Sequence, residues 1–345
     1  MKIQPSCSLK AFHTFAIDVD AKRIISAETC QDLIDIYQSP DWQQEPKLIL
    51  GKGSNVLFCE NYDGVVILNQ ITGKTVTESG EYYRLHIGAG EDWPSLVRWS
   101  LEQGISGLEN LAMIPGCAGS APIQNIGAYG VELKDICDYV DVLDLETLTE
   151  RRLTKIECQF GYRDSVFKKA LHNRVVITAI GLKLAKSWSP QLSYGSLSSF
   201  ERQTVTSQQV YDAVCNIRSS KLPDPTKLGN AGSFFKNPIV STEYYEQLQL
   251  HFPDLSGHKV ESGYKLAAGW LIDRAGLKGH QIGGAQVHKQ QALVIVNLGN
   301  ASARDIVNLA QYVKEQVMIK YGVSLEHEVR FMAKNEETNL DRLLK

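Results

Sequence analysis

The chain lacks the patterns that would direct it to a membrane, a disulfide framework or a nucleic acid. No apolar run approaches the roughly 20 residues that span a bilayer, and the first 15 residues lack the apolar core of a signal peptide. The seven cysteines are scattered, odd in number and without a C-x-x-C pair, which argues for reduced thiols. The net charge is −3 with no basic block, which excludes the usual nucleic-acid or membrane-surface binder.

These absences predict a cytoplasmic protein with no membrane insertion and no nucleic-acid partner. The eight histidines show no metal-ligand spacing, so no metal site is predicted either. What remains is an ordinary globular balance, with 43% apolar and 22% charged residues. Its 345 residues suffice for two or three domains and a large core.

The most informative segment is an uncharged, glycine-rich stretch at residues 114–130. It contains four glycines and two prolines and has neither a helical nor a strand period. Glycine lets the backbone approach a ligand closely, and successive backbone N–H groups can bind a pyrophosphate. A tight crossover between two elements is the alternative, but the composition favours a loop that holds an anionic ligand.

A second glycine segment, residues 51–55, follows directly on an apolar strand. A strand that runs into Gly-x-Gly suggests a dinucleotide fingerprint, but Val56 occupies the position of the third glycine. Residues 56–58 resume an apolar strand and open no helix, so the Rossmann hypothesis fails. Two glycine loops on one extended ligand are the better explanation.

Strand patterns dominate the first half of the chain, whereas the second half is more helical. Strands are predicted at residues 48–50, 65–69, 84–88, 139–145, 175–184 and 291–297. Helices are predicted between Pro94 and Gly104, from Ser262 to Gly276, and from the capping pair Ser302 and Asp305 to Gly322. The Ser/Pro-rich stretch 187–199 predicts a mobile loop and the charged residues after Lys334 a frayed tail. The pattern predicts an α+β protein with two ligand-facing lobes.

Ser233 is the first candidate for chemistry, because it lies between a glycine turn and two aromatics in residues 229–238. No histidine is near it in sequence and no G-x-S-x-G occurs, so a hydrolase-type nucleophile has no visible base. A serine that donates a proton needs only geometry and a driving force. A serine in a structural turn remains the alternative.

Three charged residues are further candidates. Arg163 can grip a carboxylate or phosphate through its planar fork, although an exposed ion pair with Asp164 or Glu157 is the plainer reading. Glu326 and Glu328 lie two apart on an alternating segment and would share a strand face, as an acid/base site or as a solvated edge. Lys221 stands at a rigid proline turn where it could meet a phosphate.

Taken together, these segments resemble the UDP-N-acetylenolpyruvoylglucosamine reductase (MurB) family, type I subgroup. The matching stretches are residues 50–57, 107–112, 114–130, 161–165, 229–238 and 265–272, in the family's order. The resemblance implies an FAD-binding domain of the vanillyl-alcohol-oxidase (PCMH) type and a separate α+β substrate-binding domain. We expect the first at residues 15–187, the second at 210–325, and a C-terminal strand, 326–333, that returns to the active site.

The resemblance also implies an activity and its ligands. It implies non-covalent FAD, NADPH as co-substrate, and reduction of the enolpyruvyl ether of a UDP-sugar to the lactyl ether in peptidoglycan synthesis. In the family's mechanism NADPH reduces the flavin, hydride passes to C3 of the substrate, and a serine protonates C2. A monomer is expected. A flavin oxidase of the same superfamily acting on a 2-hydroxy acid and a non-catalytic sugar-nucleotide-binding relative are the alternatives.

Site residues are carried over position by position. The catalytic positions match Ser233, Arg163 and Glu328. The cofactor-binding positions match Gly51, Lys52, Gly53, Ser54, Asn55, Ile114, Pro115, Gly116, Ser120, Ala121, Ile126 and Gly127. The substrate-binding positions match Tyr162, Tyr194, Lys221, Asn237 and Gln291, with Tyr194 in a loop that resembles the one closing over the nucleotide. His327 departs from the pattern, which more often has proline there, and this makes the backbone at Glu328 less certain.

Overall fold

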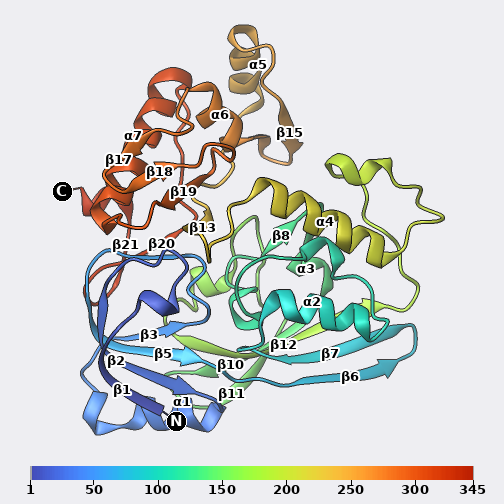
Figure 1. Ribbon diagram of the computed structural model, residues 1–345. Coiled ribbons are helices and arrows are strands. Elements are labelled where there is room, and N and C mark those ends of the chain that lie inside the picture. The colour runs from blue at the N-terminus through green and yellow to red at the C-terminus, as the bar shows by residue number, and fades with distance from the viewer. Residues whose placement is uncertain (1, 345) are drawn as a thin grey trace. The chain divides into compact units, whose positions relative to one another are not determined.

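The computed structural model describes residues 2–344, which group into two units (Figure 1). Unit 1 consists of residues 2–5, 23–52 and 64–220, and unit 2 of residues 6–22, 53–63 and 221–344. Each unit is therefore assembled from segments that are far apart in the sequence. No helix of the described residues is long and apolar enough to cross a bilayer.

An antiparallel five-stranded sheet organises unit 1, in the order β11-β10-β12-β7-β6. Its strands are β6 (Lys74–Ser79), β7 (Tyr82–Gly88), β10 (Cys137–Asp144), β11 (Glu150–Thr154) and β12 (Val175–Ala185). Cys137, Val140 and Val142 of β10 and Ile177, Ile180 and Leu182 of β12 are buried in one apolar core. The β-branched and leucine side chains suit a pleated, packed surface. The predicted strands at 84–88, 139–145 and 175–184 are confirmed.

A four-stranded sheet, β1-β2-β5-β3, lies beside a second apolar core. Its strands are β1 (Lys2–Ser8), β2 (Asp20–Ala27), β3 (Lys47–Leu50) and β5 (Tyr62–Asn69). β3 and β5 run parallel, with Leu48 opposite Val66. The strands predicted at 48–50 and 65–69 are confirmed.

The helices of unit 1 are α1 (Cys30–Gln38), α2 (Trp93–Glu102), α3 (Leu133–Ile136) and α4 (Ser207–Lys221), whose last residue opens unit 2. α2 begins where the sequence predicts, because the Asp92 carboxylate accepts the Ser95 N–H at 3.0 Å and Pro94 needs no donor. Trp93, Leu96 and Val97 form its buried face. Short strands β8 (Gly127–Ala128) and β9 (Val131–Glu132) form a hairpin at the end of the glycine-rich stretch.

Unit 2 has a four-stranded sheet in the order β13-β19-β18-β17. Its strands are β13 (Gly229–Ser233), β17 (Gln281–Ile282), β18 (Ala285–Val287) and β19 (Val294–Asn297). α7 (Ala303–Tyr321) packs on this sheet through a buried face that includes Ile306, Leu309, Val313 and Val317. The predicted capping pair is confirmed, since the Ser302 hydroxyl accepts the Asp305 N–H and the Asp305 carboxylate accepts the Ser302 N–H.

The other elements of unit 2 are shorter. They are β4 (Val56–Phe58), β14 (Ile239–Val240), β15 (Gly257–Val260), β16 (Gly263–Leu266), β20 (Arg330–Met332), β21 (Glu337–Thr338), α5 (Thr242–His251), α6 (Ala268–Arg274) and α8 (Leu340–Leu343). Single 3-10 turns complete the chain as η1 (Lys10–Phe12), η2 (Pro40–Trp42), η3 (Glu109–Leu111), η4 (Ala118–Ser120), η5 (Val166–Lys168) and η6 (Gly195–Ser199).

Three sequence predictions in unit 2 were wrong in part. The helix expected from Ser262 begins only at Ala268, because residues 263–266 pair with β15 and β14 instead. The strand expected from Gln291 begins at Val294, after a turn closed by the Val294 N–H to the Gln291 carbonyl at 3.0 Å. The tail after Lys334 is folded rather than frayed: β21 pairs with β20, and α8 docks on α7.

α8 is attached by both apolar and polar contacts. Leu340 is buried, Asp341 accepts the Lys314 ammonium at 2.8 Å, and Arg304 donates to the Leu343 carbonyl at 3.1 Å. The charged residues after Lys334 suggested a frayed tail because their partners on α7 are not visible in the local sequence.

Two glycines that end helices in unit 2 provide a matched stability test. Gly322, after α7, has φ of 62°, and a Cβ there would lie 2.2 Å from the Tyr244 hydroxyl, which donates to the Tyr321 carbonyl. Gly276, after α6, has φ of 79° and open space around it. We expect Gly276→Ala to lower the free energy of unfolding by about 1 kcal/mol, the cost of a left-handed backbone. Gly322→Ala should cost about 1 kcal/mol more, because it also displaces Tyr244. Chemical denaturation measures the free energy of unfolding of both variants. Equal decreases would show that the Tyr244 side chain moves aside at no cost.

Candidate active site

Within unit 1, residues 51 and 52 of the first glycine segment approach the second segment, whereas residues 53–55 belong to unit 2. A Cβ on Gly51 would lie 2.5 Å from Cys117 Sγ, so only glycine fits there without moving the second loop. Lys52 Nζ lies 4.0 Å from the Asp92 carboxylate, and the backbone of Asp92 forms an isolated antiparallel β-bridge with that of Cys117. Asp92, the residue before α2, thus contacts both Lys52 and Cys117, so these two residues lie near the same end of α2.

This arrangement fits a dinucleotide pyrophosphate. Within residues 2–344, the backbone N–H groups of Lys52 and Gly116 donate to no protein acceptor. The Lys52 side chain is about half exposed beside them. Unpartnered N–H groups and an ammonium are the donors that a diphosphate takes.

The other predicted cofactor residues play mixed parts. Ser120 bonds within its own turn, accepting the Cys117 N–H at 3.1 Å and donating to the Cys117 carbonyl at 2.7 Å. Asn55 belongs to unit 2, where its side-chain amide donates to the Glu328 carbonyl at 3.2 Å. Ala121 and Ile126 are buried, Ile114, Ser54 and Gly127 are half-buried, Gly53 is buried and Pro115 is exposed.

Arg163 is held in a tight turn of unit 1. Its φ is 52°, and the Gly161 N–H closes the turn on the Asp164 carbonyl at 2.9 Å. Its guanidinium donates to the Gly127 carbonyl at 3.1 Å and lies 5.6 Å from the Tyr162 ring centroid. Asp164, its neighbour in the turn, forms an ion pair with Lys169 at 2.5 Å.

Sequence reasoning missed Asn125, which attaches the glycine-rich segment to the Arg163 turn. It is fully buried with φ of 45°, and its amide donates to the Gly161 carbonyl at 2.9 Å and to Glu132 at 3.0 Å. Its carbonyl oxygen accepts the Lys134 N–H at 2.9 Å. The available signal was an asparagine, a residue that tolerates left-handed backbone, within the glycine-rich segment.

Ser233 and Glu328 lie close together in unit 2, on backbone segments that bond to each other. The Glu328 N–H donates to the Phe234 carbonyl and the Lys236 N–H to the Glu326 carbonyl, each at 2.8 Å. Ser233 itself ends β13 opposite Val294 of β19. Among the described residues its hydroxyl has no hydrogen-bond partner, so it remains available to a ligand.

The segment that carries Glu328 is not the regular strand that the alternation predicted. A single bridge joins His327 to Phe235, and β20 begins only at Arg330. Glu326 is exposed and pairs with Lys236, whereas Glu328 is half-buried. The two carboxylates therefore occupy different surroundings, and Glu326 is a surface ion pair.

Of the predicted substrate-binding residues, two have structural contacts of their own in unit 2. Asn237 accepts the Ala268 N–H at 2.9 Å at the start of α6, and Gln291 accepts the Leu293 N–H at 3.4 Å. Lys221 is exposed at the end of α4. In unit 1, Tyr194 is 58% exposed and packs edge-on against Tyr129 with ring centroids 5.6 Å apart.

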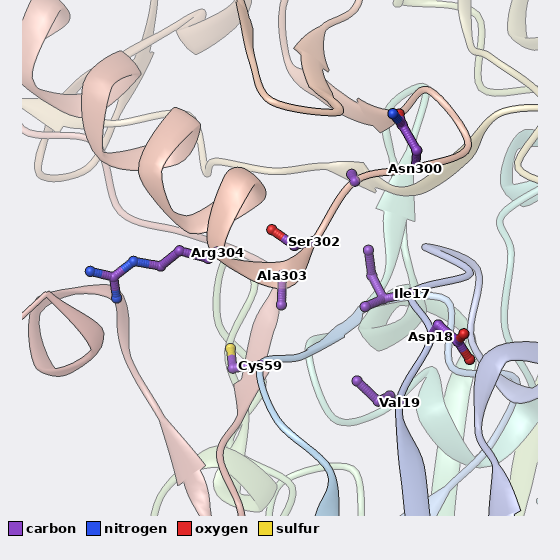
Figure 2. Close-up of a pocket in the computed structure, with 9 residues that line it drawn as sticks. Ile17, Asp18, Val19, Cys59, Asn300, Ser302, Ala303 and Arg304 are labelled. Carbon is purple, nitrogen blue, oxygen red and sulfur yellow. The ribbon is translucent and has the colours of Figure 1, made fainter.

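A separate hollow of about 430 Å³ lies elsewhere in unit 2 (Figure 2). It is lined by Ile17, Asp18, Val19, Cys59 and residues 300–304 at the start of α7. Burial raises the pKa of the Cys59 thiol to about 12, which leaves it unreactive at neutral pH. None of the predicted site residues lines it.

Comparison with known proteins identifies the family. Residues 224–332 match the family model described as UDP-N-acetylenolpyruvoylglucosamine reductase, C-terminal domain, and residues 21–150 match an FAD binding domain. The chain is 56% identical to the UDP-N-acetylenolpyruvoylglucosamine reductase of Vibrio cholerae, over 99% of this chain and 98% of that protein. This chain belongs to the UDP-N-acetylenolpyruvoylglucosamine reductase family.

Two further relatives of the reductase family agree over the full length. The Photobacterium profundum reductase is 55% identical over 100% of both chains. The crystal structure of the Thermus caldophilus reductase superposes with a TM-score of 0.67 at 25% identity, covering 96% of this chain and 99% of that one. The expected α+β fold is confirmed, with an FAD-binding domain and a C-terminal domain of the reductase family, and so is the expectation of an oxidoreductase.

His327, the departure from the family's usual proline, predicts a pH dependence of stability. Burial lowers its pKa, more than the hydrogen bond to the Val329 carbonyl at 2.7 Å raises it. An unfolded histidine binds a proton as the pH falls below about 6.5, whereas folded His327 binds one only at a lower pH, so stability is lost on acidification through that value.

We expect His327→Asn to flatten the fall in unfolding free energy between pH 7.5 and 5.5. One such histidine contributes at most about 1.4 kcal/mol per pH unit. His258→Asn, at an exposed position on β15, is the control. Denaturant titrations at several pH values measure the slopes, and a His327→Asn slope equal to wild type would contradict the assignment.

Proposed function

We propose that this chain catalyses the NADPH-dependent reduction of UDP-N-acetylenolpyruvoylglucosamine to UDP-N-acetylmuramate with non-covalently bound FAD. Membership of the reductase family supports the reaction, and the match to an FAD binding domain supports the cofactor. One observation carries the proposal: the unpartnered Ser233 hydroxyl lies on backbone bonded directly to the Glu328 segment. A hydrolase would instead require a base beside this serine.

Lys52 and Gly116, one from each glycine segment, would hold the FAD pyrophosphate through their backbone N–H groups and the Lys52 ammonium. The chemistry that FAD would supply there is hydride transfer, from NADPH to C3 of the enolpyruvyl group. The work assigned to the chain's own residues is binding, charge stabilisation and proton transfer. Hydride addition at C3 leaves negative charge on C2 and the adjacent carboxylate, so a fixed guanidinium such as Arg163 lowers the barrier.

Ser233 is assigned as the donor of a proton to C2. A hydroxyl is a weak acid in water, so it acts only against a strongly basic carbon that is held close and dry. Phe234 and Phe235, both at most 2% exposed, follow it directly in the chain, and Ser233 itself is half-buried. Glu328 is assigned a supporting role, either stabilising the carboxylate-bearing intermediate in its protonated form or orienting another group.

Ser233→Ala tests the chemical step. We expect FAD binding and flavin reduction by NADPH to stay near wild type, because neither uses this hydroxyl. Turnover to the lactyl ether should fall by about 10²–10⁴ or more, the worth of general acid catalysis. Stopped-flow mixing of reduced enzyme with substrate gives the rate, with Ser262→Ala, an exposed serine of unit 2, as control. Turnover of Ser233→Ala close to wild type would make Ser233 a turn residue only.

Lys221→Ala tests the binding assignment. A lysine on a phosphate contributes affinity rather than chemistry, so we expect KM for the sugar nucleotide to rise about tenfold. The rate of flavin reduction by NADPH should change less. Lys227→Ala removes an exposed lysine six residues away and serves as control. Selective loss of the NADPH half-reaction would assign Lys221 to the nicotinamide cofactor instead.

A further inference from the structure

Arg218, in the last turn of α4, is a cation without an anionic partner in the described residues. Its Nε is buried and has no hydrogen-bond partner, and no carboxylate of residues 2–344 forms an ion pair with its guanidinium. The residue as a whole is half-buried, and charged groups are seldom removed from water unless they are paired. Burial lowers the pKa of Arg218, and the nearby charge of Arg163 lowers it further.

The position of Arg218 follows from the period of α4. Val210 and Val214 are the buried residues of this helix, and Arg218 is the next position in the same i, i+4, i+8 row. An apolar residue would complete that stripe without cost. The chain places a guanidinium there instead, toward the interior of unit 1.

Two tyrosines connect Arg218 to the predicted substrate loop. The Tyr129 phenol interacts with the Arg218 side chain, and the Tyr129 ring packs against Tyr194 at nearly 90°. Tyr129 has φ of 49°, and Asn110, only 2% exposed, donates to the carbonyls of both Tyr129 and Gln191 at 2.9 Å. The side-chain amide of Asn110 thus holds both Tyr129, which lies beside Arg218, and the loop that leads to Tyr194.

Arg218 and Arg163 are near enough for their positive charges to repel, and the groups that most raise the pKa of Arg218 are a phenol and a thiol, Tyr129 and Cys215, rather than a carboxylate. Two neighbouring guanidinium groups destabilise the ligand-free protein. An anion that bonds to both of them makes the arrangement favourable. The UDP-sugar of the proposed reaction carries two anionic groups, the enolpyruvyl carboxylate and the diphosphate. Either matches a planar guanidinium.

We propose that Arg218 is a further substrate-binding residue that acts with Arg163 on an anionic group of the UDP-sugar, and that Tyr129 is the residue that positions it. The proposal rests on the proposed function, which supplies the ligand. Because the Tyr129 ring contacts both Tyr194 and Arg218, a movement of the Tyr194 loop would also move the group that positions Arg218.

The test measures equilibrium binding by the FAD-loaded protein of two ligands, the enolpyruvyl substrate and UDP-N-acetylglucosamine, which lacks the carboxylate. Arg218→Met should raise Kd for the substrate at least about tenfold. An equal rise for UDP-N-acetylglucosamine assigns the diphosphate, and no rise for it assigns the carboxylate. Arg218→Lys keeps the charge without the fork and should be intermediate.

Arg98→Gln is the matched control, because exposed Arg98 bonds to the Tyr211 hydroxyl at 3.4 Å in the same unit. Tyr129→Phe should raise KM by about 3- to 10-fold with a smaller change in kcat, the effect of one hydrogen bond. The melting temperature separates binding from structure. Removing an unpaired buried cation should leave the melting temperature of Arg218→Met equal to or above wild type, whereas a structural arginine would lower it.

Unchanged Kd values for both ligands in Arg218→Met would overturn the proposal, as would losses no larger than those in Arg98→Gln. If Arg218→Met does not fold, the substrate Kd values of Arg218→Lys and Tyr129→Phe decide in the same way. Failure of the wild-type protein to bind or reduce the UDP-sugar would instead refute the proposed function. The two failures are therefore distinguishable.

Discussion

Buried irregular backbone is the constraint on which the candidate site depends. Loops that approach a ligand cannot satisfy their N–H and C=O groups in a helix or sheet, yet buried groups must be paired. Five asparagines, each at most 8% exposed, supply the missing partners. They are Asn69, Asn110, Asn125, Asn230 and Asn297, bonded to carbonyls of Ile177, of Tyr129 and Gln191, of Gly161, of Pro223 and Leu228, and of Phe15.

The same amides give the site its preorganisation. Asn125 fixes the turn that carries Arg163, and Asn230 accepts the Gly232 N–H at 2.9 Å directly before Ser233. A side-chain amide both donates and accepts hydrogen bonds, so one asparagine can fix two neighbouring loop segments relative to each other. Groups held this way need not reorganise when charge develops on a substrate, which is the condition for electrostatic catalysis. Removing one such amide would leave buried carbonyls unpaired, so these residues act on function through rigidity.

The sequence anticipated elements whose cause is local, and missed those whose cause is distant. α7 was predicted almost to the residue, because its capping box and its terminal Gly322 are encoded within the helix itself. β16 was taken for helix because its strand partners supply the deciding hydrogen bonds. Asn125 and Asn110 were missed for the same reason, since their acceptors lie 36 and 81 residues along the chain. The catalytic, cofactor and substrate residues themselves remain predictions that rest on family resemblance and local geometry.

Arg218 shows where a pattern argument reaches its limit. On a helical wheel a charged residue is placed on the solvent face by default, and the stripe from Val210 through Val214 would be read as ending there. The fold turns that position inward, beside Arg163 and Tyr129. Burying a cation without an anion is unfavourable for stability, so folding alone does not account for an arginine at the end of an apolar row. An anion from outside the chain accounts for it, because binding free energy can offset a cost that the empty protein bears alone.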